Sequence, residues 1–532
     1  MIITAPKEFA MKEQKTGRGF SPKFCILFLF SAILYIWIFS KTPYGVADDL
    51  WWGLDHGMRE FLTGSANSRY LSNLLEVIVT RSWFLKAVLH GFIAAATPFF
   101  IAVLVKTRIQ SELDLSQKAD SLPETVLLLS NILFLTIPMD IWQDTYGWIA
   151  AFSNFGFAIF FLGAFQLLVS RIVLDEILAF SWVTGLGYFF FGVCIQLVLE
   201  NMTIYVFLVD FLLLIIMIIE KRSKAARSLM LVILIGNAVG LSIMFSSSSY
   251  QSLFQSGVAI NGYRTLSFDL HDNPFNIFVS LIKRFIYFYP NRILGNNWLI
   301  CCLISVLLFL LSGRGKKLVK FGIRVFAVFF FAYFLFAHFY GPLEDYLSHW
   351  NEVRTQQLNL LFFWGVFLSI LLLPWTDTNM RIILVFVWLS VLGIVAPLIA
   401  VKLIWPRYFL LSFFFMVEFC AFLFAEACRD WGKWRRVVEC IVLLAYLLVA
   451  IHRFSIYFDI GQGLKKRDAL IRAAQNGETE MLCFEELPHN EYIVVSEPPD
   501  DSAGAVAAFK EFYKIPNSVK IYNSLEDFSP KE

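Results

Sequence analysis

The chain has 532 residues, of which 58% are hydrophobic and only 16% are charged, with a formal net charge of +2. Its mean hydropathy is +0.65, and 57 residues are phenylalanine. The core of a soluble domain cannot bury so much apolar surface, whereas a lipid bilayer can cover it. Composition therefore excludes an ordinary soluble protein and indicates a polytopic membrane protein, with no nucleic-acid partner expected.

Thirteen apolar segments are predicted to be transmembrane helices, because about 20 residues are needed to cross ~30 Å of hydrocarbon. They cover roughly residues 24–40, 83–105, 123–139, 149–170, 178–199, 203–219, 228–246, 296–312, 321–339, 358–374, 382–401, 408–427 and 437–451. The expected fold class is thus an all-α polytopic membrane protein. The predicted inner turn at 171–177 fits the charge pattern least well, because it holds one arginine and two acids. A different assignment of this hairpin would change the number of spans by two.

The distribution of basic residues predicts the orientation. If the N-terminus is cytoplasmic, the inner segments hold 23 Lys and Arg and the outer loops hold 11. This asymmetry follows the positive-inside rule. The first span is not expected to be a cleaved signal peptide, because a long basic segment precedes it and no small-residue cleavage site follows it.

Three regions follow from this topology. Residues 1–23 are predicted to be a cytoplasmic tail, and residues 24–451 a transmembrane domain whose first outer loop is 41–82. An odd number of spans places residues 452–532 outside the cell, where helical and strand-like patterns predict a small α/β appendage.

The first outer loop contains the stretch GVADDLWWGLDHGMREFL (45–62). Six apolar residues here have helical spacing and predict a helix lying in the membrane interface: Leu50, Trp51, Leu54, Met58, Phe61 and Leu62. Asp48 and Asp49 stand at its start. One of them could be a simple N-cap. Two adjacent acids at a membrane surface also suit deprotonation of an acceptor hydroxyl or binding of a divalent cation.

The other outer loops carry further polar residues. The candidates for substrate binding are Asp140, Asp144, Glu200, Asn201, Arg264, Arg284, Arg354 and Arg407. A convergent group of arginines could hold a lipid-linked phosphate. The alternatives are an interfacial aromatic belt around 138–148, a hairpin at 200–202, and arginines that only contact lipid headgroups.

Two acids, Asp210 and Glu418, fall near the middle of predicted spans, together with Gln196 and Asn237. An acid inside a span indicates either a functional site or a hydrogen bond between helices. The eight cysteines show no zinc or disulfide spacing and are expected to pack as small apolar residues.

Several short motifs resemble those of the GT-C superfamily of membrane glycosyltransferases. The acidic pair Asp48-Asp49 directly follows the first span, and Asn67-Ser68-Arg69-Tyr70 precedes the second. A Trp142–Trp148 loop and Glu200-Asn201 follow. More narrowly, the chain resembles a poorly characterised bacterial family related to O-antigen glucosyltransferases. It lacks a WWD-type acceptor motif and a cytoplasmic DxD motif.

The resemblance implies transfer of a sugar from a polyprenyl-phosphate donor to a cell-surface glycan, teichoic acid or glycolipid at the outer face of a bacterial plasma membrane. Asp48 would be the general base, and Asp49 would tune it or bind a divalent cation. His56 and Arg69 would position the substrate, with Tyr70 beside them. The rival hypothesis is a transporter or flippase for lipid-linked sugars, in which Asp210 and Glu418 would be decisive.

Overall fold

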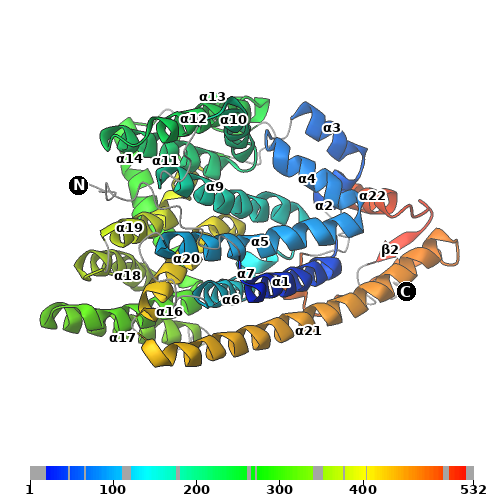
Figure 1. Ribbon diagram of the computed structural model, residues 1–532. Helices are drawn as coiled ribbons and strands as arrows, with labels where there is room; N and C mark the ends of the chain where they lie inside the picture. Colours follow the sequence, from blue (N-terminus) through cyan, green and yellow to red (C-terminus); the bar gives the residue numbers. More distant parts are fainter. Residues whose placement is uncertain are drawn as a thin grey trace.

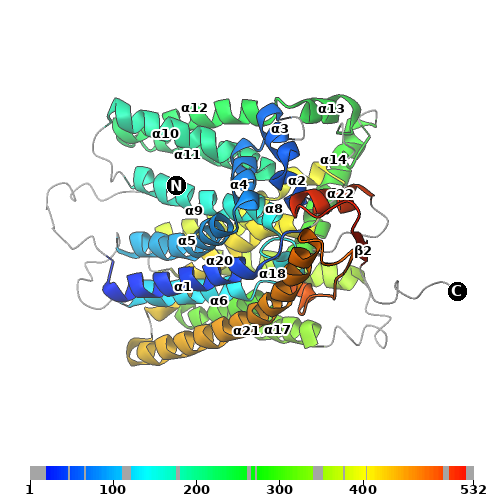
Figure 2. The same ribbon diagram turned by 90° about the vertical axis from the view of Figure 1, so that its right-hand side faces the viewer.

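The computed structural model describes residues 20–45, 48–64, 67–110, 121–174, 180–259, 265–269, 272–339, 352–375, 378–402, 404–429, 431–494 and 503–522. Within these ranges the chain is mostly helical, and its long helices form one bundle (Figure 1). Many of them lie roughly parallel to one another (Figure 2). The helical content and the apolar long helices confirm the expected class of an all-α polytopic membrane protein.

Ten helical segments are long and apolar enough, among the described residues, to cross a membrane. They are α1 (Pro22–Lys41), α5 (Trp83–Gln110), the run of α8 (Ile149–Ala151), π-helix η1 (Phe152–Gly156) and α9 (Phe157–Val173), α11 (Glu200–Ile219), α12 (Lys224–Met244), α17 (Lys317–Phe339), α18 (Glu352–Leu372), α19 (Thr378–Gly393) with η5 (Ala396–Ala400), η6 (Pro406–Phe409) with α20 (Leu410–Cys428), and α21 (Arg435–Gln475).

The remaining three predicted spans coincide with apolar helices that are either too short to count as spans or follow a sharp bend. Helices α6 (Leu122–Leu135) and α10 (Trp182–Gln196) have 14 and 15 residues. At 1.5 Å per residue each is only about 21–23 Å long, shorter than the hydrocarbon layer. The third, α16 (Trp298–Leu311), follows a 93° bend and would count as an eleventh span if the bent pair is one span. The predicted total of thirteen spans therefore stays a prediction.

Helix boundaries follow local sequence signals. Ser21 caps α1 by accepting a hydrogen bond from the Phe24 N–H at 3.0 Å, and Pro22 takes the first helical position. Helix α6 ends at Leu135, shortly before Pro138, which cannot donate a backbone hydrogen bond. This proline separates α6 from the short α7 (Met139–Gln143).

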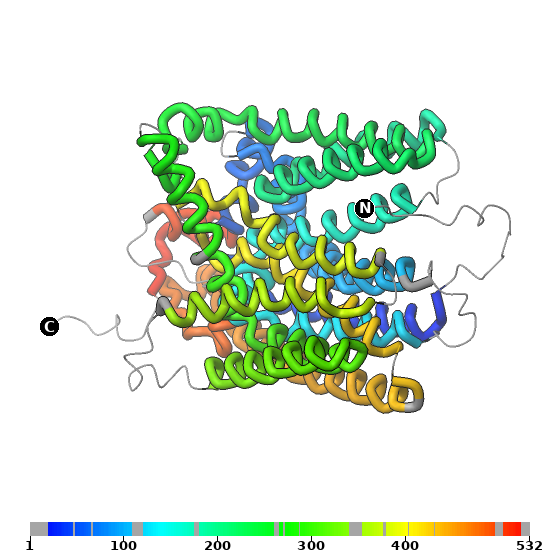
Figure 3. Tube along the Cα trace, turned by 90° about the vertical axis from the view of Figure 1, so that its left-hand side faces the viewer, coloured from blue at the N-terminus to red at the C-terminus, as the bar shows by residue number. Residues whose placement is uncertain are grey.

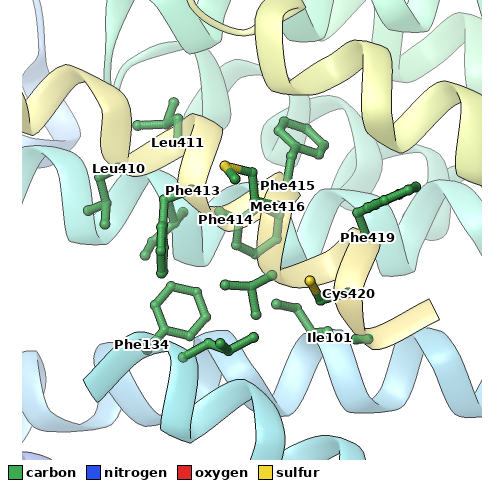
Figure 4. Close-up of a cluster of buried hydrophobic side chains, with 14 of the residues drawn as sticks. Ile101, Phe134, Leu410, Leu411, Phe413, Phe414, Phe415, Met416, Phe419 and Cys420 are labelled. Atoms are coloured by element: carbon green, nitrogen blue, oxygen red, sulfur yellow. The ribbon is translucent and has the colours of Figure 1, made fainter. Parts of the chain in front are cut away.

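Helix α20 is the centre of the bundle. All of its residues are buried, which is expected of a helix that is apolar on every side. Its phenylalanines pack against Phe134 of α6 and Ile101 of α5 (Figure 4). The lipid-facing helices instead expose large apolar side chains, such as Leu212 and Ile219 of α11.

The two ends of the bundle differ. One end gathers the shorter elements α2 (Asp48–Gly53), α3 (Asp55–Thr63), α4 (Tyr70–Arg81), α13 (Ser248–Ser256), α14 (Pro274–Lys283), η2 (Arg284–Phe288) and α15 (Tyr289–Gly295). Figure 3 shows the C-terminal segments, in red and orange, at this same end, which we call the acidic end. The opposite end carries η3 (Ser312–Arg314) and η7 (Gly432–Trp434) and an ion pair between Arg314 and Glu426.

The first loop is not a single interfacial helix. It is divided at Leu54 into α2 and α3, and α4 follows at Tyr70. The side chains of Met58 and Leu62 are exposed, as expected for an interfacial face, but Leu50 is fully buried. Leu50 packs into the C-terminal region instead of facing lipid.

The C-terminal region continues the last helix. No break occurs at residue 452, because α21 is one helix of 41 residues that ends just before Gly477, whose φ is +76°. Strands β1 (Met481–Cys483) and β2 (Lys520–Tyr522) then pair in parallel, with η8 (Asn490–Tyr492) and α22 (Ala503–Phe512) between them. The segment EYIVVSE (491–497), whose residue pattern is typical of a strand, instead begins in η8, and its last three residues lie outside the described ranges.

Candidate functional site

Asp49 is a fixed part of the acidic end. Its side chain is fully buried, and one carboxylate oxygen accepts the Gly45 N–H at 2.6 Å. The other oxygen accepts the Ala150 N–H at 2.7 Å, which ties α2 to the start of α8. Burial raises the Asp49 pKa from 3.8 to about 7, while the two N–H donors and Lys86 oppose that rise.

Asp48 lies beside it in a different environment. Its side chain is exposed to solvent, although the surrounding protein is dense. Burial by that protein raises the Asp48 pKa, and the positive charges of Arg407 and Arg69 oppose the rise. Asp48 is thus a carboxyl that solvent can reach.

Arg69 and Glu200 form a buried bidentate ion pair. The Arg69 Nε and Nη2 atoms each donate to one Glu200 carboxylate oxygen at 2.9 Å. Arg69 Nη1 also donates to the Asn154 side-chain oxygen at 3.2 Å, and the Asn154 amide donates to the Ala150 carbonyl. Since Asp49 accepts the Ala150 N–H, one network joins the first loop, η1 and the start of α11. This arrangement fixes the positions of Arg69 and Glu200.

Arg407 approaches the same region from η6. Its guanidinium lies 5.0 Å from the centre of the Trp148 ring and 3.9 Å from an Asp144 carboxylate oxygen. Trp148 also lies beside Gly45, next to the Asp49 carboxylate. Burial raises the Asp144 pKa, and Arg407 opposes that rise. The predicted residues Asp144 and Arg407 are therefore brought together near the acidic pair.

Two buried ionisable residues of this region were not among the sequence candidates. Glu76 of α4 is 1% exposed, and Lys86 of α5 is 2% exposed. Lys86 donates to the Thr42 carbonyl at 2.6 Å and lies 4.3 Å from the centre of the Tyr44 ring. A signal for Glu76 was available, because Ser72, Glu76 and Thr80 form a polar stripe at helical spacing in an otherwise apolar segment.

The other predicted residues have separate partners. Asp140 accepts a hydrogen bond from Asn296 at 2.7 Å, and Asn201 donates to the Ile394 carbonyl at 3.3 Å. Arg284 donates to the Ile399 and Val401 carbonyls. These contacts connect loops and spans within the fold.

Three more candidates lie on accessible parts of the first loop and α18. His56 is exposed and lies 3.9 Å from a Glu60 carboxylate oxygen, and Arg354 is exposed near the start of α18. Tyr70 begins α4, with its hydroxyl next to Gly64. Arg264 lies outside the described residues.

Among the described residues, no three His, Cys, Asp or Glu side chains are placed to hold a metal ion. Within this part of the chain the arrangement therefore does not fit a divalent cation held by protein side chains alone. What the site offers is an accessible carboxyl, a fixed carboxyl beside it, and two arginines that act on the accessible one.

Comparison with known proteins finds no matching family model, no similar curated protein and no similar solved structure. The resemblance to GT-C glycosyltransferases therefore depends on the motifs of the chain itself. Residues of these motifs, among them Asp48, Asp49, Arg69 and Glu200, also form the site described above.

Proposed function

We propose that this protein is a membrane glycosyltransferase that moves a sugar from a polyprenyl-phosphate donor to a hydroxyl of a cell-surface glycan, teichoic acid or glycolipid. The observation that carries the proposal is the environment of Asp48. An exposed carboxyl stands at one end of a membrane-spanning bundle, beside a buried carboxyl and under the influence of two arginines. A base for a polar acceptor and cations for an anionic leaving group are what such a transfer requires.

In this mechanism Asp48 accepts the proton of the acceptor hydroxyl. The acceptor oxygen forms a bond to the anomeric carbon as the bond from that carbon to the phosphate oxygen breaks, with inversion. The electron pair of the broken bond leaves with the polyprenyl phosphate. Arg407 stabilises that phosphate, because the guanidinium donates in a geometry that matches phosphate oxygens. Asp49 holds α2 in place through its two backbone hydrogen bonds.

The polar contacts inside the spans favour the enzyme over a transporter. Glu418 accepts a hydrogen bond from Gln166 of α9 at 2.7 Å, and Asp210 accepts one from Asn237 of α12. Each acid is thus bonded to an amide on a neighbouring helix, which is the pattern of a helix–helix contact. These pairs support a packing role for the two acids.

The same proposal includes a location. The protein would lie in a bacterial plasma membrane with its N-terminus in the cytoplasm and its acidic end outside, where polyprenyl-linked sugars meet envelope acceptors. The basis is the excess of Lys and Arg in the loops assigned to the inside.

The test is sugar transfer by membranes that contain the wild type or the Asp48→Asn variant, supplied with polyprenyl-phosphate sugars and extracted envelope glycans. Loss of a general base is expected to reduce kcat by about 10²–10⁴-fold without affecting insertion. Asp55→Asn is the matched control, because Asp55 is exposed on the neighbouring helix α3. Equal transfer by the wild type and Asp48→Asn would contradict the role of Asp48. Absence of transfer by the wild type across a broad panel would count against the glycosyltransferase.

A further inference from the structure

Glu76 of α4 lies close enough to the acidic pair for both aspartates to act on it. It belongs to the polar stripe of α4, and its carboxyl is 1% exposed. A hydrogen bond from the Asn154 side chain opposes a rise in the Glu76 pKa, while the Glu76 Oε1 atom is buried and has no hydrogen-bond partner within the described part of the chain. Leaving a charged oxygen buried without a partner is costly, whereas a protonated carboxyl avoids most of that cost.

The charges around Glu76 also favour a bound proton. Helix α2 contributes Asp48 and Asp49, and both act on Glu76 as negative charges. Among the described residues, the cation that acts on it is Arg69, which already forms a bidentate pair with Glu200. Lys86 of α5 acts on Asp49. The site therefore holds more carboxyls than uncommitted cations.

The three carboxyls differ in what they can do. Both Asp49 oxygens already accept backbone N–H groups, so the ionised form of Asp49 is supported. Asp48 is open to solvent and can exchange its proton. Only Glu76 combines full burial with an unpartnered oxygen. Burial, together with the two aspartates, raises the Glu76 pKa well above its usual range.

We propose that Glu76 is a positioning residue that works with its proton bound, and that it thereby leaves Asp48 as the carboxyl that ionises to accept the proton of the acceptor. This inference rests on the proposed function for the role of Asp48, but the protonation of Glu76 can be tested without it. A neutral Glu76 adds no negative charge near the anionic donor. Ionised, it would oppose the ionisation of Asp48 and repel the phosphate.

The first test is the melting temperature of the purified protein in detergent between about pH 5 and about pH 9. Since the Glu76 pKa is higher in the folded than in the unfolded protein, its contribution to stability is complete below the unfolded pKa of about 4.3 and is lost as pH rises through the folded pKa. Glu76→Gln removes this loss. The melting temperature of the variant is therefore expected to rise relative to that of the wild type as pH increases.

Asp49 contributes to both proteins, so the difference between them isolates Glu76. Glu511→Gln is the matched control, because Glu511 is exposed on α22, and it should leave the pH dependence unchanged. Equal pH dependence in the wild type and Glu76→Gln would overturn the proposal, whether or not sugar transfer is observed. Glu76→Met provides a second neutral replacement of similar length. Failure of both variants to fold, while Glu511→Gln folds, would also overturn it.

The second test is the pH profile of sugar transfer. Glu76→Gln is expected to keep kcat within about threefold of the wild type near neutral pH and to extend activity to higher pH. A loss comparable to that of Asp48→Asn in a folded variant would show that the ionised form of Glu76 is required, and would overturn the proposal.

Discussion

At the scale of single residues, the acidic end separates fixed groups from an accessible one. Asp49 has both carboxylate oxygens bonded to backbone N–H groups, and Glu200 has both bonded to Arg69. Asp48 stays exposed beside them. Such an arrangement supports a reactive group with neighbours that cannot move freely, which is how positioned sites gain precision.

The Arg69–Glu200 pair gives a prediction at this scale. Its side chains are only 9% and 11% exposed, so Glu200→Gln or Arg69→Met alone leaves a buried charge without its partner. Each single change is expected to cost about 3–5 kcal/mol in the free energy of unfolding. The double variant should cost clearly less than the sum, because it leaves neither charge unpaired.

The measurement is a double-mutant cycle from denaturant unfolding of the purified protein. The more accessible pair of His56 and Glu60 in the same loop, with side chains 49% and 23% exposed, is the control, for which the coupling should be below about 1 kcal/mol. Additive costs at Arg69 and Glu200 would contradict the interpretation of the pair as a structural unit.

At the scale of elements, the C-terminal region holds α2 in place. Leu50 is fully buried in a cluster with Ile471 of α21, Leu482 of β1 and Phe509 of α22. The Phe512 ring approaches Gly53 so closely that a Cβ atom there would lie 2.3 Å from it, so only glycine fits. The helix that carries the acidic pair therefore depends on residues more than 400 positions away in the chain.

Leu50→Ala tests this dependence. Removing a fully buried leucine side chain costs about 2–5 kcal/mol, and here the cost should be concentrated in the contact between α2 and α22. We expect faster amide hydrogen exchange in α2 and α22 and weaker sugar transfer, with little change in the spans. Leu62→Ala is the control, because Leu62 is 71% exposed on α3. Equal exchange rates in Leu50→Ala and the wild type would exclude an anchoring role for Leu50.

At the scale of the whole molecule, the basic and acidic ends of the bundle predict its orientation. The segments rich in Lys and Arg should face the cytoplasm, and α2 to α4 should face outward. Cysteines introduced for the exposed residues Asp55 and Lys316 report on the two ends. A membrane-impermeant maleimide should label Asp55→Cys in intact cells and Lys316→Cys only after permeabilisation.

Labelling of the unmodified protein, which contains eight cysteines of its own, provides the background. The reverse pattern would place Asp48 in the cytoplasm. A donor and acceptor at the outer face would then be excluded, although the carboxyl arrangement itself would be unaffected.

Hydropathy predicted the class of the protein because lipid solvation is a local property of each segment. All thirteen predicted spans coincide with apolar helices, but two of those helices are short and one follows a sharp bend. The first loop was predicted less well. Its apolar spacing indicated one interfacial helix, and Leu50 turned out to face the C-terminal region, because periodicity identifies an apolar face but not what covers it.

For the site, the order of residues along the chain already contains the acidic pair, its place directly after the first predicted span and the charge asymmetry of the loops. The folded protein, in contrast, pairs Arg69 with Glu200, 131 positions away. It directs Asp49 to the Ala150 N–H and buries Glu76 near both aspartates. The physical reason is that side-chain charge and apolar length are fixed along the chain. The partner and protonation of each carboxyl instead depend on how the helices pack around it.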